Sequence, residues 1–482
     1  MDYSQFLAMK QEIGLLIVFV LVFLYDTFMP RKAQGAIGGV SVVLFGLFTA
    51  ASFLCGCTKE VTEAFSGMYY TDGAVCAIKN ILNIGVFIVL IQSIKWADSD
   101  MQIMRRGEFY ELLLLTLFGM YLMISGRHFL LFVIGLETAS LPLAAMVAFD
   151  KHRYESHEAA VKYILTAVFS SAVFLMGISY VYGLTGSLYF SQIARAIAFE
   201  GGASVMLIVA LAFVIAGIGF KLSLVPFHLW TADVYQGAPT NVTSYLSVIS
   251  KGAAAFAFLA VLWQAFGQVY AQAWEWMLYA LIILTITVGN LFAMRQRNMK
   301  RFLAFSSVSQ AGYIMLGIIA FNGMGAAALM YYILVYIFSH LAAFGVIGAI
   351  ENACGKVHME DYNGLYRTNP RLAFTMMLAM FSLAGIPPFA GFFSKFFIFT
   401  SAINQGSVAI YVLVLIALIN TIISLYYYLL VVKAMFISTE QGDVPTFKSA
   451  CTERIALWIC VAGIIGLGIV SYFYNSLLTL NP

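Results

Sequence analysis

Residues 207–228 read LIVALAFVIAGIGFKLSLVPFH, and this stretch decides what kind of fold the chain adopts. A helix that spans a membrane needs about 20 mostly apolar residues, and this stretch supplies that length. Within it stand a lysine, Lys221, and a proline, Pro226. Because a proline removes a backbone donor and kinks a helix, the stretch predicts a membrane helix that carries a charge and breaks beside it.

The composition of the whole chain agrees with a membrane protein. Of its 482 residues, 62% are hydrophobic and only 10% are charged. Soluble domains have about 45–50% apolar and about 25% charged residues, so this chain lacks the polar side chains to cover a soluble surface. Soluble, disordered and disulfide-rich secreted proteins are therefore excluded. The net charge of +3 includes no basic patch with interleaved aromatic residues, which excludes a nucleic-acid-binding protein.

Fourteen apolar stretches are long enough to span a membrane, which predicts an all-α polytopic membrane protein. The first stretch lacks a small-residue cleavage site, so we interpret it as a span and not as a signal peptide. The longest polar stretches, 351–370 and 437–452, are too short for a soluble domain. The predicted spans are 8–28, 35–55, 74–95, 108–125, 128–149, 158–184, 204–230, 239–267, 272–294, 301–321, 325–350, 371–402, 408–436 and 453–477.

Basic residues in short loops predict the orientation, because such residues stay on the cytoplasmic side. With the N-terminus outside, seventeen lysines and arginines fall inside and only four outside. We therefore expect an even number of spans and both termini outside. The inside residues are Arg31, Lys32, Lys95, Arg105, Arg106, Lys151, Arg153, Lys162, Arg295, Arg297, Lys300, Arg301, Lys356, Arg367, Arg371, Lys448 and Arg454; the outside ones are Lys10, Lys59, Arg127 and Arg195.

Four charged residues lie deep in apolar sequence: Glu137, Lys221, Lys251 and Lys395. Each costs about 2.5–3.5 kcal/mol to insert into a membrane. A Glu–Lys pair that only locks two helices together is one explanation, but a single acid cannot neutralise three lysines. We therefore interpret the four residues as a pathway for protons or cations.

Lysine suits such a pathway, because desolvation lets its amine exchange a proton near neutral pH. An ion pair about 4 Å apart at an effective dielectric constant of about 20 contributes about 4 kcal/mol. Moving one charge through about 200 mV costs about 4.6 kcal/mol. Because these energies match, we predict that Glu137 and Lys221 form a switchable pair that gates one proton per cycle.

Two predicted spans are interrupted by prolines, the seventh at Pro226 and the twelfth at Pro387 and Pro388. The prolines could be simple kinks in packed helices. Broken helices near buried lysines in corresponding halves are instead typical of transport folds built from inverted repeats. We predict two inverted five-helix repeats, spans 4–8 and 9–13. The expected division is 1–100 for three N-terminal helices, 101–270 and 271–437 for the repeats, and 438–482 for the last loop and helix.

Two histidines have two possible interpretations. His340 lies in the middle of a span and His228 directly follows the break at Pro226. Each is either a hydrogen-bonded core residue or a proton relay. Asp233 and Gln236, on the loop before the eighth span, are expected to cap the helix that follows.

Two further lysines, Lys79 and Lys433, lie near the ends of their spans, and we expect both to extend toward the lipid headgroups. Lys433 remains a possible relay.

The cysteines show no spacing typical of a metal site, and no nucleotide-binding or haem-attachment motif is present. We therefore expect neither a metal nor a bound cofactor in this chain. Cys55, Cys57 and Cys76 fall near the predicted outer face, where a disulfide is permitted. Ordinary packing is the expected state of these three residues.

Three stretches resemble a known family: FKLSLVPFHLWTADVYQGAPT at 220–240, KRFLAFSSVSQAGY at 300–313 and SLAGIPPFAGFFSK at 382–395. They are similar to the antiporter-like membrane subunits of respiratory complex I, and the resemblance extends over about residues 105–437. One departure is Asn241, where the family usually has a proline. Animal mitochondrial counterparts lack the first three spans, so the resemblance implies a bacterial inner membrane protein.

The resemblance implies a role for each buried charge. Glu137 matches the acid of span five, Lys221 its partner in span seven, Lys251 the central lysine of span eight and Lys395 the terminal lysine of span twelve. It further implies that the chain translocates protons as a subunit of an NADH:quinone oxidoreductase. NADH, FMN, iron–sulfur clusters and quinone would then be bound by other subunits, and the neighbours would be K-like and M-like membrane subunits and lipids.

Two other functions remain open from the sequence. A subunit of a multi-component sodium/proton antiporter or of a membrane-bound hydrogenase would share this fold and these lysines. A structural scaffold with vestigial charges is the third possibility.

Overall fold

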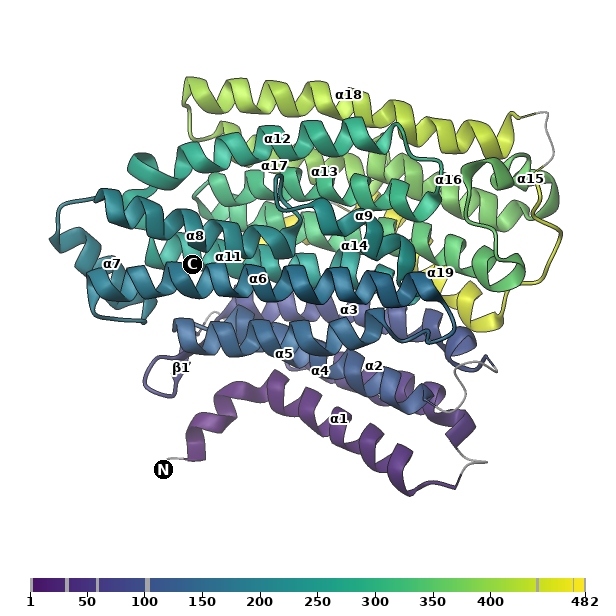
Figure 1. The fold of residues 1–482 in the computed structure, drawn as a ribbon, viewed down its shortest axis with the longest axis horizontal. Coiled ribbons are helices and arrows are strands. Elements are labelled where there is room, and N and C mark those ends of the chain that lie inside the picture. The colour runs from purple at the N-terminus through teal and green to yellow at the C-terminus, as the bar shows by residue number, and fades with distance from the viewer. Residues whose placement is uncertain are drawn as a thin grey trace.

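The computed structural model describes residues 3–30, 34–57, 60–99, 105–438, 442–470 and 472–480. Its long helices run roughly side by side along the horizontal direction of Figure 1, with the N and C labels both toward the left end. Within the described residues, 13 helices are long and apolar enough to cross a membrane. A fourteenth span is made of two shorter apolar helices, Pro370–Ala384 and Ala390–Ile403. The predicted all-α polytopic fold is therefore confirmed.

The N-terminal part consists of three long helices and a small hairpin. Its elements are η1 (Tyr3–Met9), α1 (Lys10–Phe28), η2 (Gln34–Ala36), α2 (Ile37–Leu54), β1 (Thr62–Ala64), β2 (Tyr69–Thr71) and α3 (Gly73–Ala97). The two strands pair antiparallel, with Glu63 opposite Tyr70. Asp72 ends the hairpin and caps α3, since its carboxylate accepts a hydrogen bond from the Val75 amide at 2.7 Å. This hairpin was not predicted from the sequence.

The next five spans contain the first break. They are α4 (Arg106–Ser125), α5 (Phe129–Val147), α6 (Tyr154–Thr185), the divided span of α8 (Val205–Leu222) and α9 (Leu229–Gly237), and the span of α10 (Thr240–Tyr245), the π turn η3 (Leu246–Ser250) and α11 (Lys251–Ala265). A short amphipathic helix, α7 (Phe190–Phe199), lies between α6 and α8. The predicted break is confirmed: α8 ends at Leu222, Ser223 adopts the left-handed conformation, and a helix resumes only at Leu229.

The following five spans contain the second break. They are α12 (Glu275–Ala293), α13 (Met299–Ile319), α14 (Gly323–Cys354), the divided span of α16 (Pro370–Ala384) and α17 (Ala390–Ile403), and α18 (Val408–Phe436). The short elements η4 (Gly267–Val269) and η5 (Tyr270–Trp274) precede α12, and η6 (Met359–Tyr362) and α15 (Leu365–Thr368) lie between α14 and α16. The helices α19 (Cys451–Ile469) and α20 (Tyr472–Leu480) complete the chain. Gly385, at a φ of 86°, ends α16, and the helix resumes after Pro387-Pro388 at Ala390. This break is confirmed as well.

The core of the molecule is formed by helices from both halves of the chain. All of the most apolar window of α13 is buried, and 94% of the corresponding windows of α14 and of the α10–α11 span. By contrast, only 22% is buried in α1 and in α2. A helix that is apolar all round is buried among other helices or faces lipid. The buried lysine of span eight, Lys251, therefore lies among the innermost helices.

Two glycines allow α4 and α5 to approach closely. A Cβ atom at Gly135 would lie 2.5 Å from the backbone nitrogen of Met123, and one at Gly119 would lie 2.4 Å from that of Ala139. Small residues permit such close contact between membrane helices. This crossing fixes α5, which carries Glu137 and Ser140.

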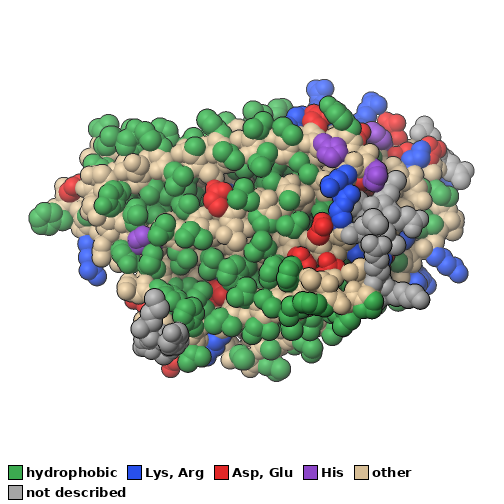
Figure 2. Space-filling view, turned by 60° about the horizontal axis from the view of Figure 1, so that its bottom comes forward, with side chains coloured by type: hydrophobic (Ala, Val, Ile, Leu, Met, Phe, Trp, Pro, Cys, Tyr) green, Lys and Arg blue, Asp and Glu red, His purple; other side chains and the backbone are tan. Residues whose placement is uncertain are grey.

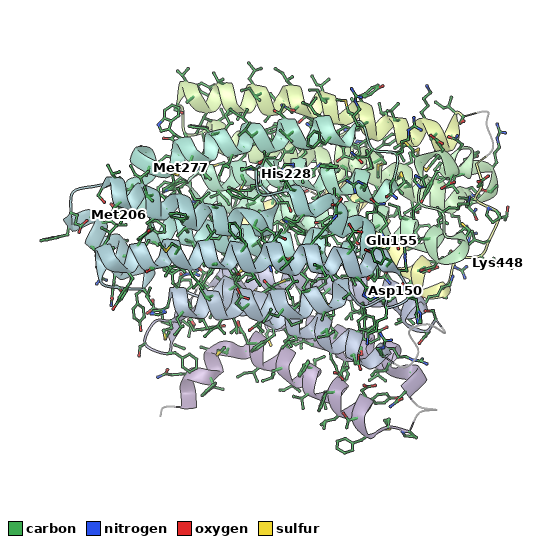
Figure 3. The ribbon with its side chains drawn as sticks, in the orientation of Figure 1. Asp150, Glu155, Met206, His228, Met277 and Lys448 are labelled. Carbon is green, nitrogen blue, oxygen red and sulfur yellow. A yellow bond between two sulfur atoms is a disulfide. The ribbon has the colours of Figure 1, made fainter. Side chains whose placement is uncertain are left out.

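The charged loops gather at one end of the molecule. In Figure 2 the basic, acidic and histidine side chains concentrate toward the right, while hydrophobic side chains cover most of the rest of that face. Figure 3 places Asp150, Glu155 and Lys448 at the right end and Met206 and Met277 toward the left. The labelled loop residues that the sequence analysis predicts on the inner side therefore lie at the same end of the molecule. Which end faces the cytoplasm stays a prediction.

Candidate functional site

The first buried lysine lies at the end of a half-helix. Lys221 is the second-last residue of α8, is 5% exposed, and directly precedes the break. Its amine donates a hydrogen bond to the Ser140 hydroxyl of α5 at 2.5 Å. Ser140 in turn donates to the carbonyl oxygen of Leu136 at 2.6 Å.

Glu137 lies on the same helix as Ser140 but has a different partner. The Ser171 hydroxyl of α6 donates to its carboxylate at 2.5 Å. No ion pair joins Glu137 to Lys221 among the described residues. A cavity of about 10 Å³ is lined by Ser140, Ser171 and Lys221. This is about the space for one water molecule. The predicted pair is therefore open in this structure, with the Ser140 and Ser171 hydroxyls beside a small cavity.

Lys251 lies at the centre of the buried helices, 1% exposed. It is the first residue after the π turn η3, and such turns occur frequently at functional sites. Its amine donates to the Ser307 hydroxyl of α13 at 2.8 Å and lies 5.6 Å from the ring centroid of Tyr235. The lysine therefore has a neutral hydroxyl and an aromatic ring as partners.

The second break provides the partners of Lys395. Its amine donates to the carbonyl oxygens of Leu383 and Ala384, at 2.9 and 3.1 Å. These are the last two residues before the break, where a helix has unpaired carbonyls and a partial negative charge. Backbone groups therefore accommodate the charge of Lys395. A cavity of about 10 Å³ also lies beside Lys395.

One helix, α13, connects the two later lysines. Ser307 accepts the hydrogen bond from Lys251, and Gln310, one turn further along, donates to the carbonyl oxygen of Leu383 at 3.5 Å. That carbonyl also accepts from Lys395. Gln310 further contacts the hydroxyls of Tyr332 and Tyr428. The sequence analysis missed Ser307 and Gln310, although both stand in the quoted stretch 300–313.

The two histidines are buried but lie apart from this chain of hydrogen bonds. His340 is 0% exposed, and its ring packs against Tyr336 and Phe344 at centroid distances of 4.6 and 5.0 Å. His228 is buried in the first break. Neither ring nitrogen of either histidine has a hydrogen-bond partner in the part of the chain that the structure describes. A relay role would therefore require water at both rings.

The lysines near helix ends differ from each other. Lys433 is exposed on α18, which agrees with extension toward the headgroups. Lys79 does not extend: it is fully buried and forms an ion pair with Glu12 at 2.5 Å. The expectation that Lys79 extends toward the headgroups is therefore wrong, and its partner Glu12 is a buried acid that was not predicted from the sequence. An acid at the start of a span and a lysine in a neighbouring span reach each other only once the helices pack.

Two ionic clusters that the sequence analysis missed connect the halves of the chain. The carboxylate of Glu351 on α14 accepts from Arg153 at 2.8 Å, lies 3.5 Å from Lys300, and accepts from the Thr240 hydroxyl at the start of span eight. Asp233 on α9 pairs with Lys162 and Arg301, each at 2.6 Å.

These clusters correct a further expectation. Asp233 and Gln236 were expected to cap the next helix, but Gln236 also accepts from Arg301, at 2.9 Å. Both side chains therefore join α9 to α13. The adjacent basic residues Lys300 and Arg301 could have indicated acidic partners in the fold, but the sequence analysis uses them only to orient the chain in the membrane.

A disulfide closes the loop between α2 and α3. Cys57 and Cys76 are bonded, and Cys55 is a free, exposed residue. Ordinary packing of Cys57 and Cys76 was therefore the wrong expectation.

Comparison with known proteins agrees with this geometry. Residues 126–424 match the family model described as "NADH:quinone oxidoreductase/Mrp antiporter, TM". The chain is 50% identical over 478 residues to the NADH-quinone oxidoreductase subunit N of Phocaeicola vulgatus, covering 99% of each chain. It is also 50% identical to the subunit N of Azobacteroides pseudotrichonymphae, covering 100% of this chain and 99% of the relative.

Solved structures share the fold. A chain of respiratory complex I from Thermus thermophilus with bound aureothin superposes with a TM-score of 0.81 at 32% identity, covering 98% of this chain and 100% of that one. A chain of the Mrp complex from Dietzia sp. reaches a TM-score of 0.84 at 20% identity, covering 99% and 96%, which shows a shared fold alone. Our chain therefore belongs to the antiporter-like, proton-translocating membrane subunits of NADH–quinone oxidoreductase, and within them to the subunit N family.

Proposed function

We propose that this subunit translocates protons along Glu137, Lys221, Lys251 and Lys395, driven by electron transfer from NADH to quinone in other subunits. The observation that carries the proposal is the connection through α13. Lys251 and Lys395 bond to Ser307 and to the carbonyl of Leu383, and Gln310 lies between these two groups. Buried amines with neutral partners can lose a proton without leaving a strong ion pair broken.

The first unit supplies the gate. Glu137 accepts a hydrogen bond from Ser171, and Lys221 donates one to Ser140. Both serines line a cavity that admits about one water molecule. When the two side chains approach, their attraction favours the charged lysine. When they separate, as here, the lysine passes its proton onward. Lys251 receives it in the centre, and Lys395 releases it toward the outer side. His228, His340 and Lys433 would contribute only through bridging water.

The organisation of the chain supports a repeated design. The third span of each predicted repeat, α6 and α14, has 32 residues and ends at a left-handed glycine, Gly186 or Gly355. The fourth span of each is the broken one. We therefore assign residues 101–270 and 271–437 to two inverted repeats, after three N-terminal helices at 1–100 and before the last loop and helix at 438–482. Both termini would lie on the periplasmic side.

Other subunits would complete the function. This chain spans the membrane and belongs to a complex whose membrane arm it helps to form. We propose that its neighbours are the K-like and M-like subunits and that it lies in a bacterial inner membrane. NADH, FMN, the iron–sulfur clusters and quinone would all bind elsewhere in the complex.

The test is a Lys251→Ala variant in the assembled complex. We expect proton pumping in membrane vesicles to be lost, while NADH oxidation by an artificial acceptor continues at the rate of the parent. Lys151→Ala, which removes an exposed loop lysine, is the matched control and should pump normally. Normal pumping by an assembled Lys251→Ala complex would refute the proposal.

A further inference from the structure

The N-terminal helices hold a buried ion pair between an acid and a lysine, away from the proposed path. The amine of Lys79 on α3 lies 2.5 Å from the carboxylate of Glu12 on α1, and the two side chains are 0% and 1% exposed. The proposed proton path, through Glu137, Lys221, Lys251 and Lys395, does not include this pair.

Hydroxyl groups surround the pair. Tyr69 of the hairpin donates to Glu12 at 2.9 Å, and Lys79 lies 3.4 Å from the same tyrosine oxygen. Ser125, at the end of α4, donates to the other carboxylate oxygen at 3.4 Å. The amine also lies 5.4 Å from the ring centroids of both Tyr69 and Tyr121. The remaining charged groups within electrostatic range of Lys79 are Asp72 and Arg127.

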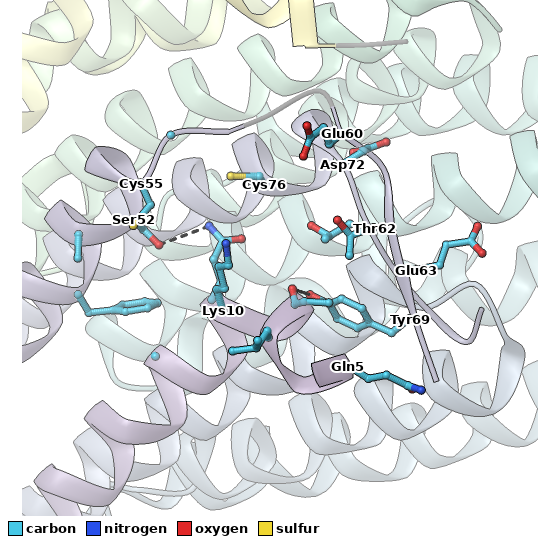
Figure 4. A pocket seen from close by; sticks show the side chains of 18 residues that line it. Gln5, Lys10, Ser52, Cys55, Glu60, Thr62, Glu63, Tyr69, Asp72 and Cys76 are labelled. Carbon is cyan, nitrogen blue, oxygen red and sulfur yellow. Dashed lines mark hydrogen bonds between the residues drawn. The ribbon is translucent and has the colours of Figure 1, made fainter. Parts of the chain in front are cut away.

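A cleft lies near the pair, on the side of the hairpin. It has a volume of about 630 Å³ and is lined with polar side chains that include Gln5, Lys10, Gln11 and Glu60. Tyr69 forms part of its wall, and Figure 4 shows this side chain among those around the cleft. Because the Tyr69 hydroxyl contacts Glu12, it lies between the cleft and the buried carboxylate.

On the inner side, polar groups continue along α3. The Tyr121 hydroxyl donates to the side-chain oxygen of Asn83, which stands one turn after Lys79. Asn83 is 0% exposed, and its amide nitrogen has no hydrogen-bond partner within the described ranges. A Cβ atom at Gly85 would lie 2.3 Å from Ile249, so this part of α3 packs on the π turn that precedes Lys251. A buried amide without a partner is costly unless water reaches it.

A purely structural pair would not require these features. Replacing a buried ion pair by apolar side chains is often neutral or stabilising, so the pair is weak evidence for a contribution to stability. A clamp between α1 and α3 needs neither a tyrosine in the wall of a cleft nor an unpartnered amide on the other side.

We propose that Glu12 and Lys79 form a second proton-exchange site, open to the cleft through the Tyr69 hydroxyl and continued inward by Tyr121 and Asn83. The Lys79 ammonium transfers its proton to the Glu12 carboxylate, which gives a neutral amine and a carboxylic acid. The acid then donates to the Tyr69 oxygen as the tyrosine proton passes to water in the cleft. Water beside Asn83 takes up a proton from the path that contains Lys251 and passes it to the amine, so each cycle moves one proton from that path to the cleft. This inference rests on the proposed function, because it supplies that proton path with an additional outlet.

The test uses Tyr69→Phe, which removes one hydroxyl and keeps the ring, in the complete complex in vesicles. We expect the protons pumped per NADH to fall to less than half, with assembly and NADH oxidation by an artificial acceptor unchanged. Tyr182→Phe, at an exposed tyrosine of α6, is the matched control and should pump normally. A Glu12→Gln, Lys79→Met double variant replaces the pair by neutral side chains and should show the same loss.

Normal pumping by Tyr69→Phe overturns the second site, and so does normal pumping by an assembled double variant. If the double variant does not assemble, Tyr69→Phe alone decides. The Lys251→Ala variant separates the two proposals. Normal pumping in Tyr69→Phe with lost pumping in Lys251→Ala rejects only the second site, whereas normal pumping in Lys251→Ala rejects the proposed function itself.

Discussion

The amine of Lys395 lies 2.9 Å from the carbonyl oxygen of Leu383, across the break that separates α17 from α16. The two residues are twelve positions apart in the sequence and belong to the two halves of one interrupted span. An intact helix would have used that carbonyl for its own backbone hydrogen bond. The break thus creates the acceptor that holds the buried charge.

Replacing Lys395 by arginine separates charge binding from proton exchange. Arginine can donate to the same carbonyls but does not release its proton in proteins. We expect Lys395→Arg to assemble and to lose proton pumping in vesicles. Lys395→Leu should lose pumping too, and Lys395→Glu should retain part of it, because a carboxyl group can also relay a proton. An arginine variant that pumps like the parent would show that Lys395 does not exchange protons.

Glu137→Ala should abolish most pumping and the quinone turnover coupled to it. It removes the only acid near Lys221 among the described residues, so the two states of the gate no longer differ in energy by the roughly 4 kcal/mol of an ion pair. NADH oxidation by an artificial acceptor should continue unchanged. Glu108→Gln, at an exposed acid of α4, is the control. Native gels establish assembly, and an assembled Glu137→Ala complex that pumps normally would contradict the gate.

Gln310→Leu tests the connection along α13. The substitution keeps a similar volume but removes the amide that contacts the carbonyl of Leu383 and the hydroxyls of Tyr332 and Tyr428. Leaving such buried groups without a partner costs about 1–3 kcal/mol, and if this cost falls on the transfer step it slows proton transfer by about 5- to 150-fold. We expect slower pumping in an assembled complex, measured against Gln192→Leu at an exposed position. Unchanged pumping would place the link between the lysines elsewhere.

Glu351→Gln should mainly weaken the protein. It leaves Lys300, 1% exposed, without its carboxylate and removes the charge opposite Arg153. Breaking a buried pair from one side costs about 3–5 kcal/mol. We expect a lower yield of assembled complex and a lower unfolding temperature. Glu360→Gln, whose partner Arg297 is 81% exposed, should leave both unchanged. Equal stability of the two variants would show that the cluster does not hold the halves together.

The sequence predicted the elements that depend on local composition. Span number and the two breaks follow from apolar length and from Pro226, Pro387 and Pro388, because the membrane penalises unpaired backbone wherever it occurs. The buried residues Lys221, Lys251 and Lys395 were found for the same reason. The hydrogen-bond partners of these lysines, such as Ser140 for Lys221 and Ser307 for Lys251, were not predicted, because they lie far away in the chain. Small hydroxyl residues are common in membrane helices and show no distinctive sequence pattern.

The sequence by itself determined that the chain is a membrane protein with buried charges and two interrupted spans, because hydrophobicity and proline act on each segment separately. Only the tertiary structure decided how the charges are accommodated. Lys395 is held by the carbonyl of Leu383 and not by an acid, and Lys79 joins Glu12 at 2.5 Å instead of extending to the surface. Such partners are set by which helix faces meet, and that depends on the packing of all the helices together, which no single segment encodes.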